Sequence, residues 1–256
     1  MITDTEIAAL RDTLDRLGDG PALVHTSLIP LGISSGIAEH LELLKAVFAG
    51  RETFLPAFNY DYYKSRWFNP YTDTCWEVGC LNEYVRSAQP GLRSDTPIYS
   101  VVSLFDNPKM DMGATETPLG KGSVFEYVDR SKGIGAFWGA PFSSNTFLHY
   151  VEEIAQVGYR YPKRFDSVMH RVRPPGDIVE IDWERIEDDL AANGLLVSVP
   201  LGRGMLWAFR ADRVMDYWIV RLRDEESYFL TRESCERVAE LALRVGYPFT
   251  LEGVEG

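Results

Sequence analysis

The chain has 256 residues, of which 45% are hydrophobic and 25% charged, as in an ordinary globular protein that can bury a sizeable core. Its 38 acidic and 26 basic residues give a net charge of −12, which argues against a nucleic-acid partner, because phosphate binding needs a basic face. No apolar run approaches the roughly 18 residues of a membrane span, and the acidic, amphipathic start is unlike a targeting peptide, so we expect no membrane partner and a cytoplasmic protein.

Helices and strands alternate at the start of the chain. Thr3 and Glu6 have the spacing of a capping box, which predicts a helix that ends at the glycines 18 and 20. Residues 22–28 are expected to form a mostly apolar strand, 36–49 a second helix, and 53–58 a buried strand. This alternation is typical of an α/β sheet.

An aromatic segment follows over residues 59–77. It has little periodicity and contains Asn-Pro at 69–70, so we expect a long ordered loop rather than a helix or strand. Its seven aromatic side chains argue against disorder. They are Tyr60, Tyr62, Tyr63, Trp67, Phe68, Tyr71 and Trp76.

The remaining pattern predicts helices near 80–88 and 123–130, strands near 98–105 and 134–139, and a helix that opens at Asn145. Residues 177–183 alternate like a half-exposed strand, 195–200 and 205–210 read as a hairpin, and helices are expected near 211–216 and 232–245. We therefore predict an α/β fold with a mixed central sheet flanked by helices. Residues 1–256 form a single domain in this interpretation, with a smaller β-containing C-terminal lobe at about 171–256.

The first chemical candidate is a His-x-x-Glu pair in the helix after Asn145. His149 and Glu152 are three residues apart and therefore lie on the same side of a helix. A neutral imidazole oriented by a carboxylate is suited to act as a general base on an N–H or O–H group. Such a pair is also common on exposed helix surfaces without any function, so a catalytic role for it depends on a second site that could bind a cofactor.

A second candidate is the turn that follows the strand at 22–28. His25 lies near the end of that strand, and the turn leads into the next helix with Gly and hydroxyl residues, which is a possible anion or carbonyl-oxygen site. A buried structural histidine is an equal alternative. Ser34 stands in a Gly-x-Ser-x-Gly pattern, which leaves open a serine hydrolase that uses Ser34 as nucleophile and His149 as base.

Metal and disulfide chemistry have little support in the sequence. His149 and Glu152 have no third ligand nearby, so no metal site is expected. Cys75, Cys80 and Cys235 are odd in number and scattered, and we expect buried free thiols.

Five segments, taken together, resemble a known family. They occur in the order and spacing of the aminoglycoside 3-N-acetyltransferases, over about residues 20–165. These segments are VHTSLIPLG, TFLPAFNYD, LNEYVRSAQPGLRSDTPIYSV, LGKGSVFEYV and NTFLHYVEE.

The resemblance implies an N-acetyltransferase with acetyl-CoA as acyl donor, no metal, and a small-molecule amine or amino-sugar acceptor. It implies that His149, oriented by Glu152, is the catalytic base and that His25 takes part beside it. Backbone N–H groups near 31–35 are expected to bind the developing oxyanion. The cofactor-binding residues that it implies are Thr26, Ser27, Leu28, Leu31, Gly32, Arg93, Ser94, Leu119, Gly120, Lys121, Gly122 and Ser123.

The acceptor site is expected to draw on Tyr60, Asp61 and Glu83, with the aromatic loop as one wall, because aromatic faces stack on sugars and carboxylates pair with ammonium groups. One position departs from the family: Thr96 precedes Pro97 where its members usually have His-Pro. This change and the aromatic loop leave two kinds of acceptor open, an aminoglycoside or a nucleotide-linked amino sugar. A catalytically silent CoA- or sugar-binding protein is a third alternative.

Overall fold

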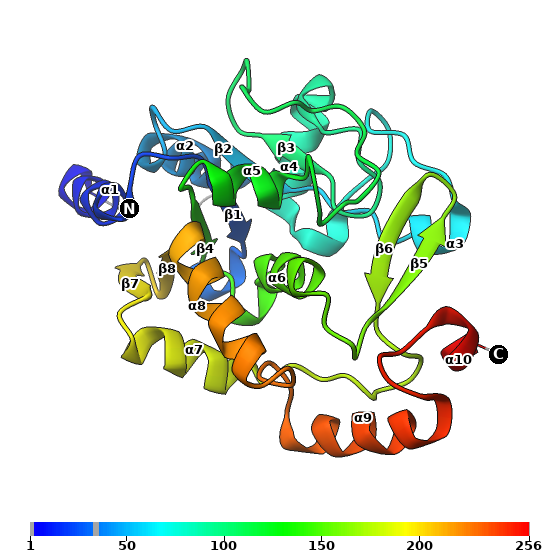
Figure 1. Ribbon diagram of the computed structural model, residues 1–256. Coiled ribbons are helices and arrows are strands. Elements are labelled where there is room, and N and C mark those ends of the chain that lie inside the picture. The colour runs from blue at the N-terminus through cyan, green and yellow to red at the C-terminus, as the bar shows by residue number, and fades with distance from the viewer. Residues whose placement is uncertain (1–2, 33–35, 256) are drawn as a thin grey trace.

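A six-stranded mixed sheet forms the centre of the computed structural model, which describes residues 3–32 and 36–255 (Figure 1). The strand order is β3-β2-β1-β4-β8-β7. β1 runs parallel to β2 and β4, whereas β3, β8 and β7 each pair antiparallel with their neighbours. The strands are β1 (Ala22–Thr26), β2 (Thr53–Pro56), β3 (Val101–Ser103), β4 (Ile134–Trp138), β7 (Leu196–Leu201) and β8 (Gly204–Arg210). The predicted α/β fold with a mixed central sheet is confirmed.

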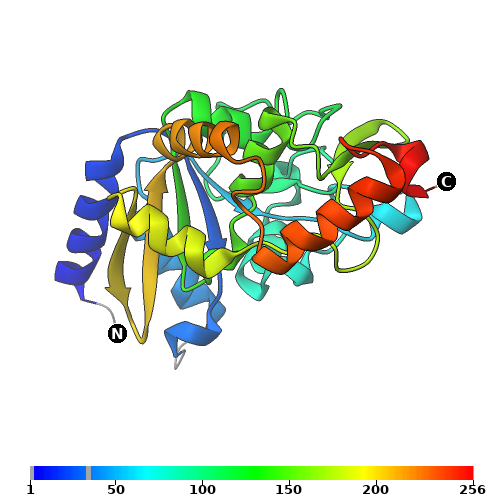
Figure 2. The same ribbon diagram turned by 60° about the horizontal axis from the view of Figure 1, so that its bottom comes forward.

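Helices cover both faces of this sheet (Figure 2). One face packs against α1 (Asp4–Leu17), α2 (Ile37–Val47) and α4 (Cys80–Ala88), and the other against α5 (Val124–Arg130), α6 (Phe147–Ala155) and α8 (Ala211–Asp224). Side chains alternate along a strand, so Leu23 belongs to the core beneath α5 and α6, whereas Val24 belongs to the core beneath α1 and α2. The same alternation turns His25 toward the α6 face and Thr26 toward α4.

A hairpin and further helices complete the fold beside the sheet. β5 (Tyr161–Phe165) pairs with β6 (Val168–Val172) in a separate two-stranded sheet. Tyr161 donates to Glu255 in α10 at 2.7 Å, and Tyr62 in α3 donates to the carbonyl of Phe165, so the hairpin is held between these two helices. The other helices are α3 (Tyr62–Ser65), α7 (Trp183–Ala192), α9 (Arg232–Val245) and α10 (Leu251–Glu255).

The structure corrects two expectations about the second half of the chain. Residues 177–183 form no strand: only Ile181 makes an isolated bridge, to Leu230, and Trp183 begins α7 after an Asp182 cap. The hairpin β5–β6 was not predicted. The hairpin β7–β8 was predicted, and its strands extend the central sheet beyond β4.

Three further expectations concern cysteines, membranes and the aromatic loop. The three cysteines are free thiols, but Cys80 is exposed and Cys235 half-buried, so only Cys75 is buried as expected. Within 3–32 and 36–255, no helix is long and apolar enough to cross a membrane. The aromatic segment is ordered and contains α3, and Asn59 and the backbone of Asn69 both donate to Asp73 at 2.9 Å.

Candidate active site

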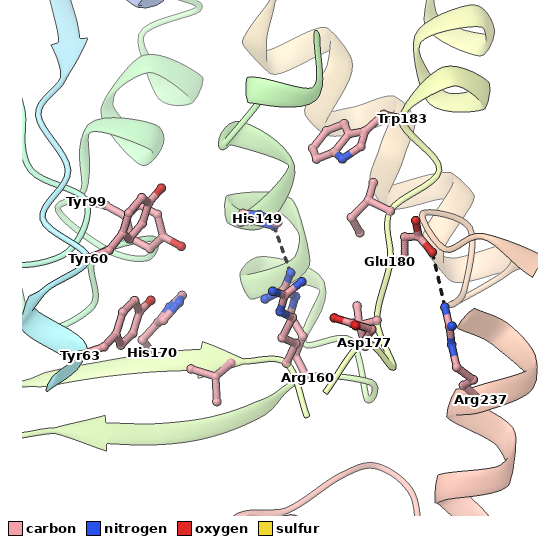
Figure 3. A pocket seen from close by; sticks show the side chains of 14 residues that line it. Tyr60, Tyr63, Tyr99, His149, Arg160, His170, Asp177, Glu180, Trp183 and Arg237 are labelled. Atoms are coloured by element: carbon pink, nitrogen blue, oxygen red, sulfur yellow. Dashed lines mark hydrogen bonds and ion pairs between the residues drawn. The ribbon is translucent and has the colours of Figure 1, made fainter. Parts of the chain in front are cut away.

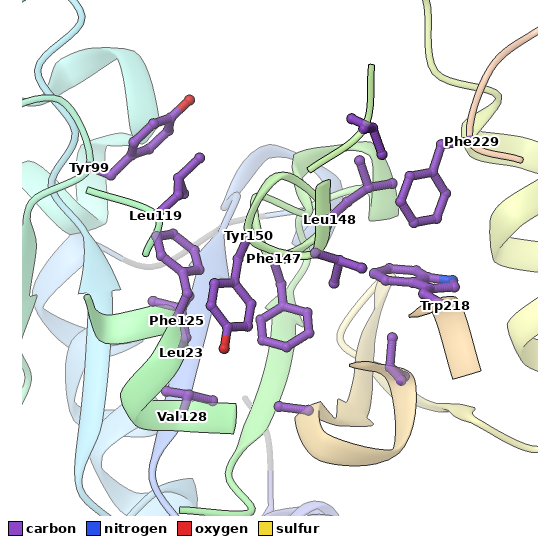
Figure 4. Packing of buried hydrophobic residues seen from close by; sticks show 14 of the residues in the cluster. Leu23, Tyr99, Leu119, Phe125, Val128, Phe147, Leu148, Tyr150, Trp218 and Phe229 are labelled. Carbon is purple, nitrogen blue, oxygen red and sulfur yellow. The ribbon is translucent and has the colours of Figure 1, made fainter. Parts of the chain in front are cut away.

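Aromatic packing fixes the position of α6 on the sheet (Figure 4). Phe147 packs against Phe209 of β8 with ring centroids 5.6 Å apart, and Tyr150 stacks on Phe125 of α5 at 6.4 Å. The Tyr150 hydroxyl donates to Asp129 at 2.9 Å. Because α6 contacts the sheet and α5 at several points, the one side chain of its first turn that remains half-exposed, His149, has a fixed direction.

Glu152 is fully buried one turn after His149 and is surrounded by hydrogen-bond donors. Its Oε2 lies 2.7 Å from Nδ1 of His149 and 2.8 Å from Nε of Arg160, and its Oε1 accepts from the Tyr159 hydroxyl at 3.0 Å. A carboxylate can only accept, so Nδ1 of His149 is the donor in this pair. The Nε2 lone pair of His149 is therefore free to take a proton.

Burial and the neighbouring charges together keep the ring of His149 neutral while Glu152 stays ionised. Burial lowers the pKa of His149, Arg160 and Arg173 lower it further, and Glu152 opposes them. Burial alone raises the pKa of Glu152, but Arg160 and His149 outweigh it and hold that pKa at about 2. A neutral imidazole beside a charged carboxylate is the state that a general base requires at neutral pH.

His149 lines a large cavity, which we call the acceptor cavity (Figure 3). Its volume is about 840 Å³, enough for a small molecule of the size of a sugar or larger. In Figure 3 the tyrosines and His170 lie on one wall, Asp177 and Glu180 on the other, and His149 and Arg160 between them. The lining residues are Tyr60, Tyr63, Tyr99, His149, Arg160, His170, Val172, Arg173, Asp177, Val179, Glu180, Ile181, Trp183 and Arg237.

His25 lines a second, smaller cavity of about 340 Å³, which we call the His25 cavity. Thr26 and Ser27 from the end of β1 and Ser144 and Thr146 from the start of α6 also line it. Its remaining lining comes from Phe58, Tyr60, Glu77, Val78, Gly79 and Pro141. Tyr60 lines both cavities, so the structure brings the two predicted catalytic histidines into neighbouring sites.

The surroundings of His25 are apolar. Its ring stacks on Phe137 at a centroid distance of 5.5 Å and meets the edge of Phe58 at 6.4 Å. Burial lowers the pKa of His25 to about 3, so the imidazole is neutral. Its Nε2 is buried and has no hydrogen-bond partner among the described residues. A polar ligand in the His25 cavity can supply that partner.

The other residues expected around His25 divide between this cavity and the core. Thr26 donates to Oδ1 of Asn82 at 2.6 Å, which ties β1 to α4. Leu28 and Leu31 are buried in the core. The N–H groups of Leu31 and Gly32 donate to Leu28 and Ile29 at 3.2 Å, so neither is available to an oxyanion. Residues 33–35, with Ser34 of the hydrolase alternative, lie outside the described residues.

A second group of expected cofactor-binding residues lines neither cavity. Arg93 is buried: Nε donates to Ser100 at 3.1 Å, and the guanidinium also contacts the carbonyls of Ala57 and Asp73. Ser94 accepts from the N–H of Val101 at 2.9 Å. Leu119 and Gly120 are buried, Lys121 and Gly122 are exposed, and Ser123 caps α5 by accepting from the N–H of Glu126. The geometry supports structural roles for Arg93, Ser94 and Ser123, and their binding of CoA stays a prediction.

The three expected acceptor residues lie in different surroundings. Tyr60 lines both cavities, as the prediction requires. Asp61 is exposed before α3 and lines neither cavity. Glu83 is 4% exposed, paired with Arg86 at 2.6 Å, and accepts from the N–H of Cys75 at 2.8 Å. With both its oxygens engaged, Glu83 has no free face to offer an ammonium group.

Several residues of the site have no signal in the sequence. Tyr159 and Arg160 lie beyond the end of α6, so no helical spacing links them to Glu152, although they complete its shell. His170 is 3% exposed and lines the acceptor cavity from β6. Within the described ranges, no group of three His, Cys, Asp or Glu side chains is placed to hold a metal ion.

Comparison with known proteins identifies the family. A family model described as aminoglycoside 3-N-acetyltransferase matches residues 23–223. None of the curated proteins compared with the chain matches it. Solved structures share the fold: the apoenzyme of aminoglycoside acetyltransferase AAC(3)-IVa is 20% identical, with a TM-score of 0.67 over 91% of this chain and 96% of that one.

Two other solved structures give the same result. AAC-IIIb, in a binary complex with CoASH, is 20% identical, with a TM-score of 0.67 over 90% of this chain and 98% of that one. The YokD protein from Bacillus subtilis is 18% identical, with a TM-score of 0.62 over 86% and 94%. Because the family model spans most of the sequence, this chain belongs to the aminoglycoside 3-N-acetyltransferase family.

Proposed function

We propose that this N-acetyltransferase moves the acetyl group of acetyl-CoA directly onto a primary amine of an amino sugar, with His149 as the general base. One observation carries the proposal: His149 lines a cavity of about 840 Å³ while its Nδ1 is held 2.7 Å from a buried, ionised Glu152. This contact leaves Nε2 to remove the proton that makes an ammonium group unreactive.

The His25 cavity is the proposed place of the thioester end of acetyl-CoA. The relative AAC-IIIb was solved with CoASH, and the cavity offers this chain's hydroxyls of Thr26, Ser27 and Ser144 together with the unpartnered Nε2 of His25. The thioester supplies an acetyl group activated for transfer. Because burial keeps His25 neutral, it acts by hydrogen bonding and not as a charged acid.

The amino-sugar acceptor is supported by the relatives and by the walls of the acceptor cavity. AAC(3)-IVa was solved in complexes with a gentamicin and with apramycin, both as a histidine-to-alanine variant. In this chain, Tyr60, Tyr63 and Trp183 line the acceptor cavity and offer aromatic faces on which sugar rings pack.

Replacement of His149 by Ala tests the base. We expect the turnover number to fall by about 100- to 10,000-fold, the usual contribution of general-base catalysis, with the dissociation constant of acetyl-CoA unchanged. Release of CoA from acetyl-CoA, followed with a thiol-reactive dye, gives the turnover, and calorimetry gives the binding. Turnover in the variant equal to that of the wild type would refute the assignment.

A further inference from the structure

More guanidinium groups than carboxylates line the acceptor cavity, whereas acidic residues outnumber basic ones in the chain as a whole. Three guanidinium groups line the cavity, from Arg160, Arg173 and Arg237, against the two carboxylates of Asp177 and Glu180. The chain as a whole has a net charge of −12. Arginines are therefore concentrated at the acceptor cavity of an otherwise acidic protein.

Two of these arginines already have partners. Arg160 is paired with Glu152 beneath the cavity floor at 2.8 Å, and Arg237 is paired with Glu180 at 3.4 Å. Arg173 and Asp177 are exposed, and neither makes a hydrogen bond or an ion pair with any residue in the described ranges. The free charges of the cavity are thus one guanidinium and one carboxylate.

His170 adds a neutral polar group to the wall. It is 3% exposed, it lines the cavity beside Tyr63, and its Nδ1 has no hydrogen-bond partner among the described side chains and backbone (Figure 3). Burial lowers the pKa of His170 to about 3, and the ring stays uncharged. A buried polar atom without a partner is costly, and a ligand with hydroxyl groups in the cavity provides one.

We propose that the acceptor is an amine that also bears an anionic group, a carboxylate or a phosphate, which is bound by Arg173 while the amine lies at His149. This inference rests on the proposed acetyl transfer and narrows its acceptor. Guanidinium groups bind carboxylates and phosphates through two parallel hydrogen bonds. A sugar with several ammonium groups fits poorly, because it brings like charge to the unpaired Arg173 and finds only Asp177 unpaired among the lining carboxylates that the structure describes.

The position of Arg173 also links the anion to the base. Arg173 is one of the groups that lower the pKa of His149. An anion bound to Arg173 neutralises this charge and makes His149 a stronger base when the acceptor is in place. An acceptor that bears an anion thereby promotes the removal of its own amine proton by His149, whereas an amine without an anionic group does not.

Binding and turnover measured on matched sugars test the inference. The ligands are glucosamine, glucosamine 6-phosphate, the corresponding 2-amino uronic acid and gentamicin, each titrated by calorimetry into the protein with CoA bound. We expect at least one acid-bearing sugar to bind about tenfold or more tightly than glucosamine, as for a hydrogen-bonded charge. Arg173→Gln should remove this advantage, so that the acid-bearing sugars bind the variant no more tightly than glucosamine does.

Arg164→Gln is the control. It removes the same charge from the nearby strand β5, and Arg164 does not line the acceptor cavity. A preference for the phosphate or for the uronic acid identifies the anion. Equal binding of the acid-bearing sugars and glucosamine, tighter binding of gentamicin, no detectable binding of any sugar, or an advantage that survives in Arg173→Gln would overturn the inference. Thiol release with the same ligands tests the proposed function separately: tight binding without any turnover defeats acetyl transfer and leaves the anion site standing.

Discussion

His25 and His149 are both neutral, but the two surroundings achieve this in different ways. His25 lies between Phe137 and Phe58, and burial alone depresses its pKa. Burial lowers the pKa of His149 as well, but Arg160 and Arg173 lower it further and Glu152 raises it, so this pKa also depends on the neighbouring charges. A ring of the first kind is locked in one protonation state, whereas a ring of the second kind can accept a proton that Glu152 then stabilises.

The largest effect is expected when the charge beside His149 is removed. Glu152→Gln leaves Arg160 buried without its counter-charge, which should lower the free energy of unfolding by about 3–5 kcal/mol. The variant should also lose about 100-fold or more in turnover, because a neutral amide stabilises the protonated ring of His149 less than the carboxylate does. Urea denaturation and thiol release measure the two losses.

Glu153→Gln is the matched control for Glu152→Gln, since it changes the same charge on the same helix and Glu153 forms no hydrogen bond or ion pair with His149. We expect it to be close to wild type in turnover. If both variants lose turnover equally, the charge of α6 and not the contact with His149 is responsible, and the contrast between the two histidines fails.

The next effect concerns stability in acid. A histidine whose pKa is lower in the folded than in the unfolded state gains its proton only on unfolding, so stability is lost as the pH falls below 6.5 towards the folded value of about 3. His25 should contribute up to about 1.4 kcal/mol per pH unit in this window. His25→Asn should show a shallower loss in urea denaturation between pH 6.5 and 4, and a slope equal to that of the wild type would show that His25 is not held neutral by burial.

The smallest effect is a displacement of the pH profile. The acid limb of kcat/KM should lie below pH 6.5, because the pKa of His149 is lowered. Arg173→Gln removes one of the charges that lower the pKa of His149, so the acid limb should move to higher pH. His25→Asn should leave the limb at the same pH. A limb that moves in His25→Asn and stays in Arg173→Gln would reverse the roles of the two histidines.

The sequence predicted the parts of this site that depend on local spacing. His149 and Glu152 share a helix face, which follows from periodicity, and His25 was expected near the end of a strand, where β1 places it. Arg160 and His170 come from a hairpin whose first strand carries Pro162, Lys163 and Arg164 and gives a weak strand signal. Their arrival at the site depends on tertiary packing, which local patterns do not encode.

The same limit explains the errors in the second half of the chain. Residues 177–183 alternate as a strand should, but no neighbouring strand in the described part of the chain pairs with them, and only the bridge between Ile181 and Leu230 forms. Glu83 was expected to pair with an ammonium group of the acceptor, but the structure pairs it with Arg86, three residues later. Arg93 and Ser94 match the family's motif, and the structure engages their side chains with backbone groups: Arg93 donates to the carbonyl of Ala57, and Ser94 accepts from the N–H of Val101.

The order of strands in the sheet has a consequence for folding. β1 pairs with β4, more than 100 residues later, and β4 then pairs with β8, whose residues end at 210. Contacts of such long sequence separation form slowly, because loop closure must precede them. Arg237 of α9 also lines the acceptor cavity. During synthesis the cavity beside His149 is therefore incomplete until residue 237 has been made and α9 has packed.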